Sequence, residues 1–420
     1  MMAEQNQTLP SIAYDPALLH RVKTDLDTPI IGEVENKLTL FLVGVSSWCE
    51  EKVHLSSIIT GESSAGKSWL MNNTLKYFSN VKSFSRITAA APDRLEEDMS
   101  HIILKVEELK GADAAQSTLR IMISEGKLEL LTTDKGEGDQ KGKIITRTIT
   151  TKGTPCFVTS TTTLFPDEEL MNRTLVQSVD ETAEQTKKIL EREAKEFMEV
   201  EPKWEPDPEI CALISSLHSY FNVLIPYADL LAKKFPAVSL KSRRDFKKLL
   251  NLIYVCAYLH QHQRPIIQNP ENKVQTFILA LPQDFYMVWE IVGKTFRDTL
   301  ENLQERHRKV LAVFEGEHDS IQTSQSIAAK TGYGDDRARQ LLNSLTDKGY
   351  LTCSDEHRPY SYALNEKGDP SVLGLGDTLD SFGEYDLDFY CGSRNLSVKE
   401  RGFQVGYVSP ISGKRRAETG

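Results

Sequence analysis

The sequence predicts an α/β protein with a central parallel sheet. Three observations indicate this fold class. A short apolar run is followed at once by a glycine-rich loop and a helix. Strand-like and helix-like segments then alternate as far as Thr161, which is typical of a parallel sheet covered by helices. Further along, the segment 305–363 has the order helix, helix, helix and strand pair, which indicates a separate small domain.

The glycine-rich loop has the pattern G-x-x-x-x-G-K-S and lies between the strand-like run Ile58–Thr60 and a helix. In such a loop successive backbone N–H groups point at phosphates, the lysine meets the β and γ oxygens, and the serine hydroxyl is a Mg²⁺ ligand. The helix N-terminus adds a positive dipole end. The sequence therefore predicts that ATP and Mg²⁺ bind here. The residues concerned are Gly61, Glu62, Ser63, Ser64, Ala65, Gly66, Lys67 and Ser68.

Length and composition limit the remaining possibilities. The 420 residues are enough for two or three domains, and the net charge of −10 excludes a uniformly basic surface for nucleic acid. The six cysteines are widely spaced, which favours reduced thiols over a disulfide framework or a zinc site. The polar N-terminus does not resemble a signal peptide, and no apolar run is long enough to span a membrane. We expect a cytoplasmic protein.

The alternation after the loop defines the expected sheet and an insertion within it. Helices are predicted over 16–26, 33–48 and 112–124, and strands over 81–91, 100–108 and 155–161. Two β-rich runs, 127–134 and 144–151, flank a segment rich in glycine and lysine, which predicts a long hairpin. In a parallel sheet of this kind, nucleotide chemistry lies at the carboxyl ends of the strands.

Two carboxylates follow the apolar run Ile102–Val106, at the end of a predicted strand. Hydrolysis needs one acidic group near Mg²⁺ and another that polarises the attacking water. We assign Glu107 to the metal and Glu108 to the water. The alternative is an acidic loop after a buried strand.

Three more residues complete the predicted chemistry. Thr161, or else Ser160, ends a strand in a hydroxyl that suits the γ-phosphate or the lytic water. Arg173 lies just before another strand, where a cation can reach the γ-phosphate of a neighbouring subunit, although such an arginine is more often a surface residue. Arg244, or Arg243, opens a helical region and can sense the triphosphate from the other side.

In this order, these features resemble the AAA+ ATPases, in particular the clade with a hairpin before the sensor strand. The likeness is greatest to the motor of minichromosome-maintenance helicases and of primase-helicases from mobile elements and archaea, and it covers about 25–363. Glu107 departs from the aspartate that is usual there. The resemblance implies a homo-oligomeric ring, commonly of six subunits, with ATP between neighbours and hairpin tips lining a channel for DNA. It also makes a primase a candidate partner.

The hairpin and the C-terminal part carry the candidate DNA contacts. Hairpin cations can neutralise phosphates without reading sequence, although a solvated hairpin is the alternative. The helix–helix–helix–strand-pair segment is typical of a winged helix-turn-helix. Its acidic start, Asp335 and Asp336, weakens base reading and leaves a protein contact equally open. The candidate DNA contacts are Lys135, Lys141, Lys143, Arg147, Arg337, Arg339 and Arg358.

The expected domains follow from these elements. They are an N-terminal segment (1–24), an AAA+ ATPase core (25–205) with its hairpin at 127–151, a mainly helical lid (206–302), a winged helix-turn-helix (303–366) and a mostly disordered tail (367–420). His260 and His262 end a lid helix, where nothing further in the spacing supports a metal site.

Two function hypotheses therefore remain in different classes. The first is an ATP-driven DNA translocase or helicase in the replication of a prokaryotic or mobile genome. The second is a DNA-binding ATP switch, such as a loader or a regulator of transcription or transposition, which unwinds nothing. A small-molecule kinase is disfavoured by the hairpin, the lid arginine and the winged helix. Strand displacement distinguishes the first hypothesis from the second.

Overall fold

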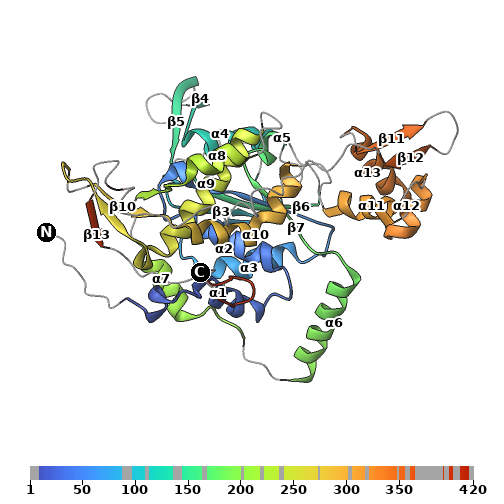
Figure 1. Ribbon diagram of the computed structural model, residues 1–420. Coiled ribbons are helices and arrows are strands. Elements are labelled where there is room, and N and C mark those ends of the chain that lie inside the picture. Colours follow the sequence, from blue (N-terminus) through green and yellow to red (C-terminus); the bar gives the residue numbers. More distant parts are fainter. Residues whose placement is uncertain are drawn as a thin grey trace. The chain divides into compact units, whose positions relative to one another are not determined.

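In the computed structural model the chain folds into two compact units (Figure 1). The first comprises Met1–Gly293 together with Leu375–Gly420, and the second comprises Lys294–Gly374. We call them unit 1 and unit 2. The described residues are 9–87, 97–108, 113–135, 144–162, 168–199, 203–217, 222–235, 241–272, 275–300, 305–316, 321–347, 350–354, 360–364, 391, 397–400 and 407–415.

A parallel five-stranded sheet is the centre of unit 1, as predicted. Its strand order is β2-β3-β6-β1-β7, and every neighbouring pair is parallel. This confirms the α/β fold class. The strands are β1 (Ser57–Thr60), β2 (Val81–Phe84), β3 (Ile103–Val106), β6 (Cys156–Thr161) and β7 (Leu175–Ser178).

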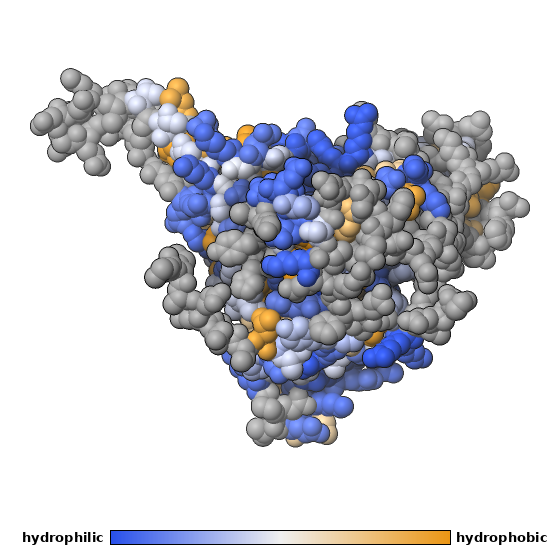
Figure 2. All heavy atoms as spheres, turned by 60° about the vertical axis from the view of Figure 1, so that its left-hand side comes forward, coloured by the Kyte–Doolittle hydropathy of each residue, from blue (hydrophilic) through white to orange (hydrophobic). Residues whose placement is uncertain are grey.

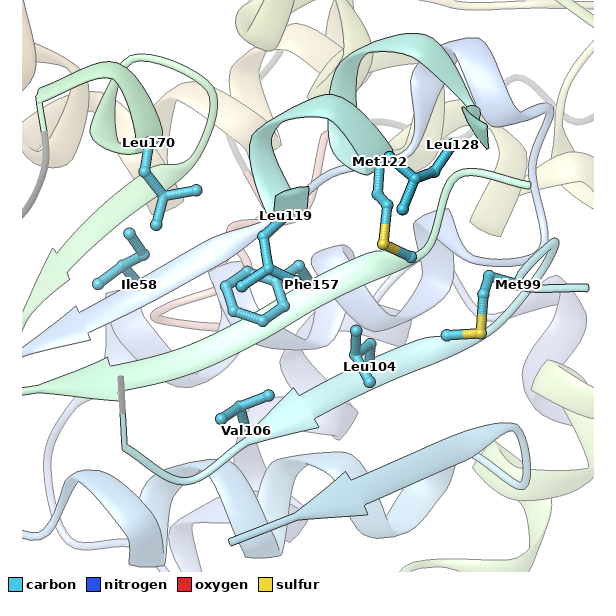
Figure 3. Packing of buried hydrophobic residues seen from close by; sticks show 9 residues of the cluster. All are labelled: Ile58, Met99, Leu104, Val106, Leu119, Met122, Leu128, Phe157 and Leu170. Atoms are coloured by element: carbon cyan, nitrogen blue, oxygen red, sulfur yellow. The ribbon is translucent and has the colours of Figure 1, made fainter. Parts of the chain in front are cut away.

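Helices cover both faces of this sheet. On one face, α4 (Asp113–Glu125) packs over alternate residues of the strands and forms the hydrophobic cluster shown in Figure 3. Phe157 lies in this cluster between Leu104 and Leu119 and is fully buried. The other face is covered by α2 (Val34–Ser46) and α3 (Lys67–Thr74), because intervening strand residues contact them.

The predicted hairpin is present as β4 (Lys127–Lys135) and β5 (Ile144–Lys152), paired in antiparallel register from Lys127↔Lys152 to Lys135↔Ile144. It projects from the sheet region beside α4 (Figure 1). At its base, Leu128 is buried against the cluster under α4, whereas Leu131 is 75% exposed. The base therefore anchors the hairpin, while farther along its strands Thr146 and Thr148 are also exposed.

Two of the remaining helices of unit 1, α6 (Ala183–Met198) and α7 (Pro208–Ser216), begin at residues whose side chains cap them. The side chain of Asp207 accepts a hydrogen bond from the N–H of Glu209 at 2.8 Å, with Pro208 in the first turn. The hydroxyl of Thr182 accepts one from Gln185 N in the same way. The helices are α1 (Leu18–Asp27), α5 (Glu168–Met171), α6 (Ala183–Met198), α7 (Pro208–Ser216), α8 (Ala228–Lys234), α9 (Ser242–Leu259) and α10 (Pro282–Leu300).

A second sheet lies in the region that we expected to be mainly helical. It has four strands in the order β13-β9-β10-β8. These strands are only three or four residues long, and no motif or strand–helix alternation marks them, so the sequence pattern did not reveal them. The strands are β8 (Asn222–Leu224), β9 (Ile266–Gln268), β10 (Thr276–Leu279) and β13 (Ser397–Glu400).

The C-terminal segment also departs from expectation, because its described parts pack on the rest of unit 1. Strand β13 forms one edge of the second sheet by pairing with β9. Cys391 is buried with Ile267 and Leu279. Farther on, Ser409 Oγ donates a hydrogen bond to Glu290 on α10 at 2.5 Å. Residues 397–400 and 407–415 of the tail are thus ordered, while the prediction of a mostly disordered tail as a whole stays a prediction. The low hydrophobicity of this segment did not indicate these contacts, because they form only with the folded surface of the rest of unit 1.

Unit 2 has the predicted order of elements. Three helices precede an antiparallel strand pair with the register Leu351↔Leu364. Identification of this unit as a winged helix-turn-helix stays a prediction. Its elements are α11 (Glu305–Gly316), α12 (Ser324–Thr331), α13 (Asp335–Asp347), β11 (Leu351–Ser354) and β12 (Ser361–Leu364). Among the described residues of the whole chain, no helix has both the length and the apolar character to cross a bilayer.

The cluster under α4 gives the first testable expectation. Phe157→Ala should lower the free energy of unfolding by about 3–5 kcal/mol, because it removes a fully buried ring and leaves a cavity. The exposed Leu131→Ala should change it by no more than about 0.5 kcal/mol. Urea denaturation followed by circular dichroism measures both values. Equal, small effects would contradict the packing described here.

Candidate functional site

The glycine-rich loop has the backbone geometry that its motif requires. It leaves β1 after Thr60 and enters α3 at Lys67. Gly66, at φ +81°, is in the left-handed region that glycine tolerates best. At Gly61, an added Cβ would lie 2.5 Å from Val179 Cγ2, so the end of β7 leaves no room for a side chain. The strand–loop–helix arrangement predicted from the sequence is thus present.

Lys67 is folded onto the loop itself. The residue is 8% exposed, and its ammonium group donates hydrogen bonds to Gly61 O at 3.1 Å and to Glu62 O. Ser63, Ser64 and Ser68 are exposed. A phosphate group cradled by the N–H groups of the loop would therefore meet the Lys67 ammonium and the Ser68 hydroxyl from the solvent side.

The order of strands brings the predicted catalytic elements to one edge of the sheet. Strand β6 lies between β1 and β3, with Thr161 opposite Thr60 and Thr159 opposite Val106. Neighbouring strands are about 4.8 Å apart, so the ends of β1 and β3 are about 10 Å apart. The loop, the hydroxyl-ended strand and the acidic residues after β3 consequently share the carboxyl edge.

Backbone contacts fix Glu107 at this edge. Glu107 N donates to Phe84 O at 3.0 Å, and Glu107 O accepts from Ser160 Oγ at 2.6 Å. The side chains of Glu107 and Glu108 are half-buried. Because successive residues of a strand point to opposite faces, continuation of β3 would direct the two carboxylates differently. This separation suits the two roles that we assigned to them.

Lys105 is a site residue that the sequence analysis missed. Its side chain is 7% exposed, lies 3.6 Å from Glu107 Oε1, and donates to Asn72 Oδ1 on α3. This contact places Glu107 on the side of the sheet that faces the phosphate-loop helix. The signal was present in the sequence, since Lys105 is the only charged residue in the run Ile102–Val106. Its charge partly neutralises that of Glu107.

The contacts of β6 distinguish the two hydroxyl candidates. The Ser160 hydroxyl is used to hold the Glu107 carbonyl. Thr161 is 5% exposed, and its carbonyl accepts the N–H of Gly61 at 3.3 Å. Thr161 is thus attached directly to the first residue of the phosphate loop. This arrangement favours Thr161 over Ser160 as the group that meets a γ-phosphate or a water beside it.

The two predicted arginines lie at the opposite edge of the sheet. Arg173 and Arg244 line one cavity of about 620 Å³, together with Ser56 and Leu175 at the amino ends of β1 and β7. Arg173 is held in place, with Nε donating to Ser124 Oγ at 2.6 Å. A four-residue strand is about 13 Å long, so this cavity is remote from the loop of the same subunit.

Further cations surround this cavity, which we call the amino-edge cavity. Lys52, Lys247 and Lys248 join the two arginines in its lining, and Glu51 and Glu125 are its acidic members. Lys248 lies 3.0 Å from Asp245, and burial lowers the pKa of its ammonium group. The sequence did not reveal this gathering, because its members come from segments that are far apart in the chain.

The structure describes only part of the predicted DNA-contacting set. Lys135 ends β4, and Arg147 pairs with Thr132 in the hairpin register, while their side chains lie outside the described part. Lys141, Lys143 and Arg358 also lie outside the described residues. The predicted hairpin contacts therefore stay a prediction.

In unit 2 the two described candidate arginines have local partners. Arg339 pairs with Asp335 at 3.2 Å, one helical turn away. The guanidinium of Arg337 lies 5.2 Å from the ring centroid of Tyr333, and Lys309 Nζ lies 4.9 Å from the same centroid. The acidic first turn of α13 is present as expected. These contacts do not distinguish DNA from a protein as the partner of unit 2.

A buried group of Cys256, His260 and Asp284 has the composition of a metal site. Its hydrogen bonds indicate another role. Asp284 accepts three short contacts from the Arg264 guanidinium, at 3.1, 2.9 and 2.6 Å, and one from Leu281 N at 2.8 Å. Burial raises the pKa of the Cys256 thiol, which keeps it protonated. The carboxylate is thus occupied by a buried ion pair, and the group belongs to the core.

Comparisons with known proteins give only distant similarity. No protein-family model and no curated protein matches the sequence. Among solved structures, a full-length MCM homologue from Methanopyrus kandleri is similar with 12% identity and a TM-score of 0.40, over 68% of this chain. This chain spans 61% of the length of that homologue.

Two other solved structures are similar over a larger part of the chain. A RuvB mutant from Thermotoga maritima has 14% identity and a TM-score of 0.29, over 80% of this chain and 94% of RuvB. The C-terminal region of NrS-1 has 14% identity and a TM-score of 0.25, over 85% of this chain and 76% of that region. Each of the three similarities covers only part of this chain.

The buried His260 predicts a pH dependence of stability. Burial, followed by the charge of Arg264, lowers its pKa from 6.5 to about 4. Between these pH values the unfolded chain binds a proton that the folded protein does not, so stability falls as the pH falls from about 6.5 to 4. The loss approaches about 3 kcal/mol. Urea denaturation across this range should show a smaller slope for His260→Gln than for the wild type. Equal slopes would contradict this assignment.

Proposed function

We propose that this chain is a Mg²⁺-dependent AAA+ ATPase that moves along or unwinds DNA as a ring of identical subunits. One observation carries the proposal. The phosphate loop and the carboxylates share the carboxyl edge of the sheet, whereas Arg173 and Arg244 line a cavity at the amino edge. A site for hydrolysis needs cations that stabilise the developing charge, and here they come from a second subunit.

The residues at the carboxyl edge suit the steps of hydrolysis. The loop N–H groups and Lys67 bind and orient the triphosphate. Glu108 orients the attacking water, and Thr161 holds the water or the γ-phosphate from the adjacent strand. Arg173 of a neighbouring subunit approaches the same phosphate from outside. The half-buried side chains and the exposed loop leave this edge accessible to that neighbour.

The donor set at this edge fits Mg²⁺. Ser68 is exposed and the Glu107 side chain is 44% exposed, so a hydroxyl and a carboxylate are available while water can occupy the remaining positions. When bound, Mg²⁺ would neutralise negative charge on the triphosphate and so assist hydrolysis. Lys105 holds Glu107 beside α3 and so positions this ligand.

The proposed DNA contact is the hairpin. Its paired strands are nine residues long and project from unit 1 (Figure 1), and the sequence at and between their connected ends contains Lys135, Lys141 and Lys143. Cations of this kind bind the phosphate backbone without reading the bases. In a ring, such tips line the central channel. The resemblance to replicative motors supports a role in DNA replication, with a primase among the candidate partners.

One observation favours the alternative, a DNA-binding ATP switch. The ammonium of Lys105 is 3.6 Å from Glu107, and a nearby cation weakens a carboxylate as a ligand for Mg²⁺. Slow turnover suits a switch better than a motor. Displacement of a labelled strand from a forked duplex decides between the two. DNA-stimulated hydrolysis with displacement supports the motor, and nucleotide-dependent DNA binding without displacement supports the switch.

The role of Glu108 can be tested separately from binding. Glu108→Gln should reduce ATP turnover by about 10²- to 10⁴-fold, because an amide cannot polarise the attacking water, while Mg·ATP still binds. A coupled phosphate-release assay and titration with a fluorescent ATP analogue measure the two properties. The control is Glu129→Gln, an exposed carboxylate on β4. Turnover near the wild-type rate in Glu108→Gln would refute the assignment.

The proposed site between subunits makes a distinctive prediction for Arg173. Arg173→Ala should lower turnover by about 10³-fold or more, as does loss of an arginine that stabilises the transferred phosphoryl group. Lys67→Ala should also be inactive. Mixing the two inactive variants should restore part of the activity, because one kind of interface then has both an intact loop and an intact arginine.

Each inactive variant mixed with itself is the control for this experiment. If the mixture stays inactive although mixed assemblies form, Arg173 does not act on a neighbour. If Arg173→Ala alone retains full turnover, it has no role in hydrolysis.

A further inference from the structure

We propose that helix α6 anchors one subunit to the next by docking its exposed apolar stripe on a second copy of this chain. This inference rests on the proposed function, because it takes the assembly of subunits from it. Helix α6 has 16 residues, and only Gln185 is buried and Arg192 half-buried along it. Figure 1 shows α6 standing away from the rest of unit 1.

The exposed apolar residues of α6 form one stripe. Leu190, Ala194, Phe197 and Met198 have the spacing i, i+4, i+7, i+8, which places them along one side of a helix. Leu190 is 59% exposed, Phe197 is 95% exposed and Met198 is 80% exposed. Ile189, 38% exposed, flanks the stripe. Large apolar side chains gathered at such exposure indicate an interaction site.

The stripe faces away from the body of its own unit. Gln185 and Arg192, the two residues of α6 with reduced exposure, are seven positions apart and share one side of the helix. At 100° per residue this side is roughly opposite Leu190 and Phe197. Gln185 Nε2 donates to Ile31 O at 2.5 Å on that side. The described part of unit 1 therefore does not cover the stripe.

The base of α6 is attached to the phosphate loop. Glu181, two residues before the helix, accepts the N–H of Glu62 through Oε1 at 2.5 Å. Thr182 caps the helix, and its own N–H is held by Asp180 Oδ1 at 2.9 Å. If ATP lies between neighbouring subunits, then α6 begins at the edge of that interface. Its length of about 24 Å is sufficient to reach over the next subunit.

The charges of α6 favour a protein partner. Four basic residues (Lys187, Lys188, Arg192 and Lys195) balance four acidic ones (Glu184, Glu191, Glu193 and Glu196). A helix that lies on an anionic membrane or on DNA usually carries an excess of lysine and arginine. Among the coloured residues on the face that Figure 2 shows, most are hydrophilic, and the hydrophobic ones form small separate areas. A second copy is the partner that the proposed interface already brings close.

Matched double variants test this role. Leu190→Gln with Phe197→Gln removes the stripe, while Lys188→Gln with Lys195→Gln changes two exposed residues at the same spacing on another side of α6. Sedimentation velocity with Mg·ATP over a range of protein concentrations measures assembly. We expect the first variant to assemble at least about tenfold more weakly than the wild type and the second to assemble normally. Circular dichroism should show both folded.

Three outcomes would overturn the inference. In the first, both variants assemble equally well, and in the second the wild type stays monomeric at all concentrations. In the third, the wild type floats with phosphatidylserine-containing vesicles and only the stripe variant fails to do so. Titration with a fluorescent ATP analogue keeps the two proposals separate. The stripe variant should bind the nucleotide as monomer. If the wild type binds none, the proposed function fails, whereas assembly through the stripe is still decided by sedimentation.

Discussion

The position of β6 between β1 and β3 is the constraint on which the candidate site depends. Hydrogen bonding between parallel strands fixes Thr161 beside Thr60 and Thr159 beside Val106. The phosphate loop, Thr161 and the carboxylates therefore cannot move apart without breaking the sheet. Two further contacts reinforce the arrangement, namely Gly61 N with Thr161 O and Ser160 Oγ with Glu107 O. The packing of Phe157 under α4 holds the middle strand in place (Figure 3).

The two edges of the sheet carry different charged groups, and this difference bears on how subunits could assemble. Carboxylates lie at the edge that would bind the nucleotide, and a group of cations lies around the amino-edge cavity. A single subunit thus presents complementary surfaces at its opposite edges, which suits head-to-tail contact between copies. Helix α6 begins at the carboxyl edge and extends its apolar stripe outward, so the same contact would bury it. Nucleotide binding and assembly are then connected through Glu181 and Glu62.

The sequence predicted the local features of this site and missed the long-range ones. The loop is recognisable because all its requirements lie within Gly61–Ser68, and the hairpin because its strands are nine residues long. The strands of the second sheet are as short as β1 and β3, but no motif accompanies them, and β13 comes from a segment with no periodicity, so this sheet was missed.

Contacts between side chains from distant segments could not be predicted from the sequence either. Nothing in the local pattern brings Lys105 to Asn72 on α3, or Arg173 to the cavity of Arg244, because tertiary packing creates both contacts. Cys256, His260 and Asp284 show the opposite case. Their residue types suggest a metal, whereas the ion pair of Asp284 with Arg264 assigns them to the core.

The most direct measurement for the central claim is calorimetric titration of Mg·ATP into the wild-type protein and into Lys67→Ala. The account predicts saturable binding to the wild type and binding weakened at least about tenfold in the variant, because a charged hydrogen bond to the phosphates is lost. Absence of binding to the folded wild type, or equal affinity of the two proteins, would contradict it.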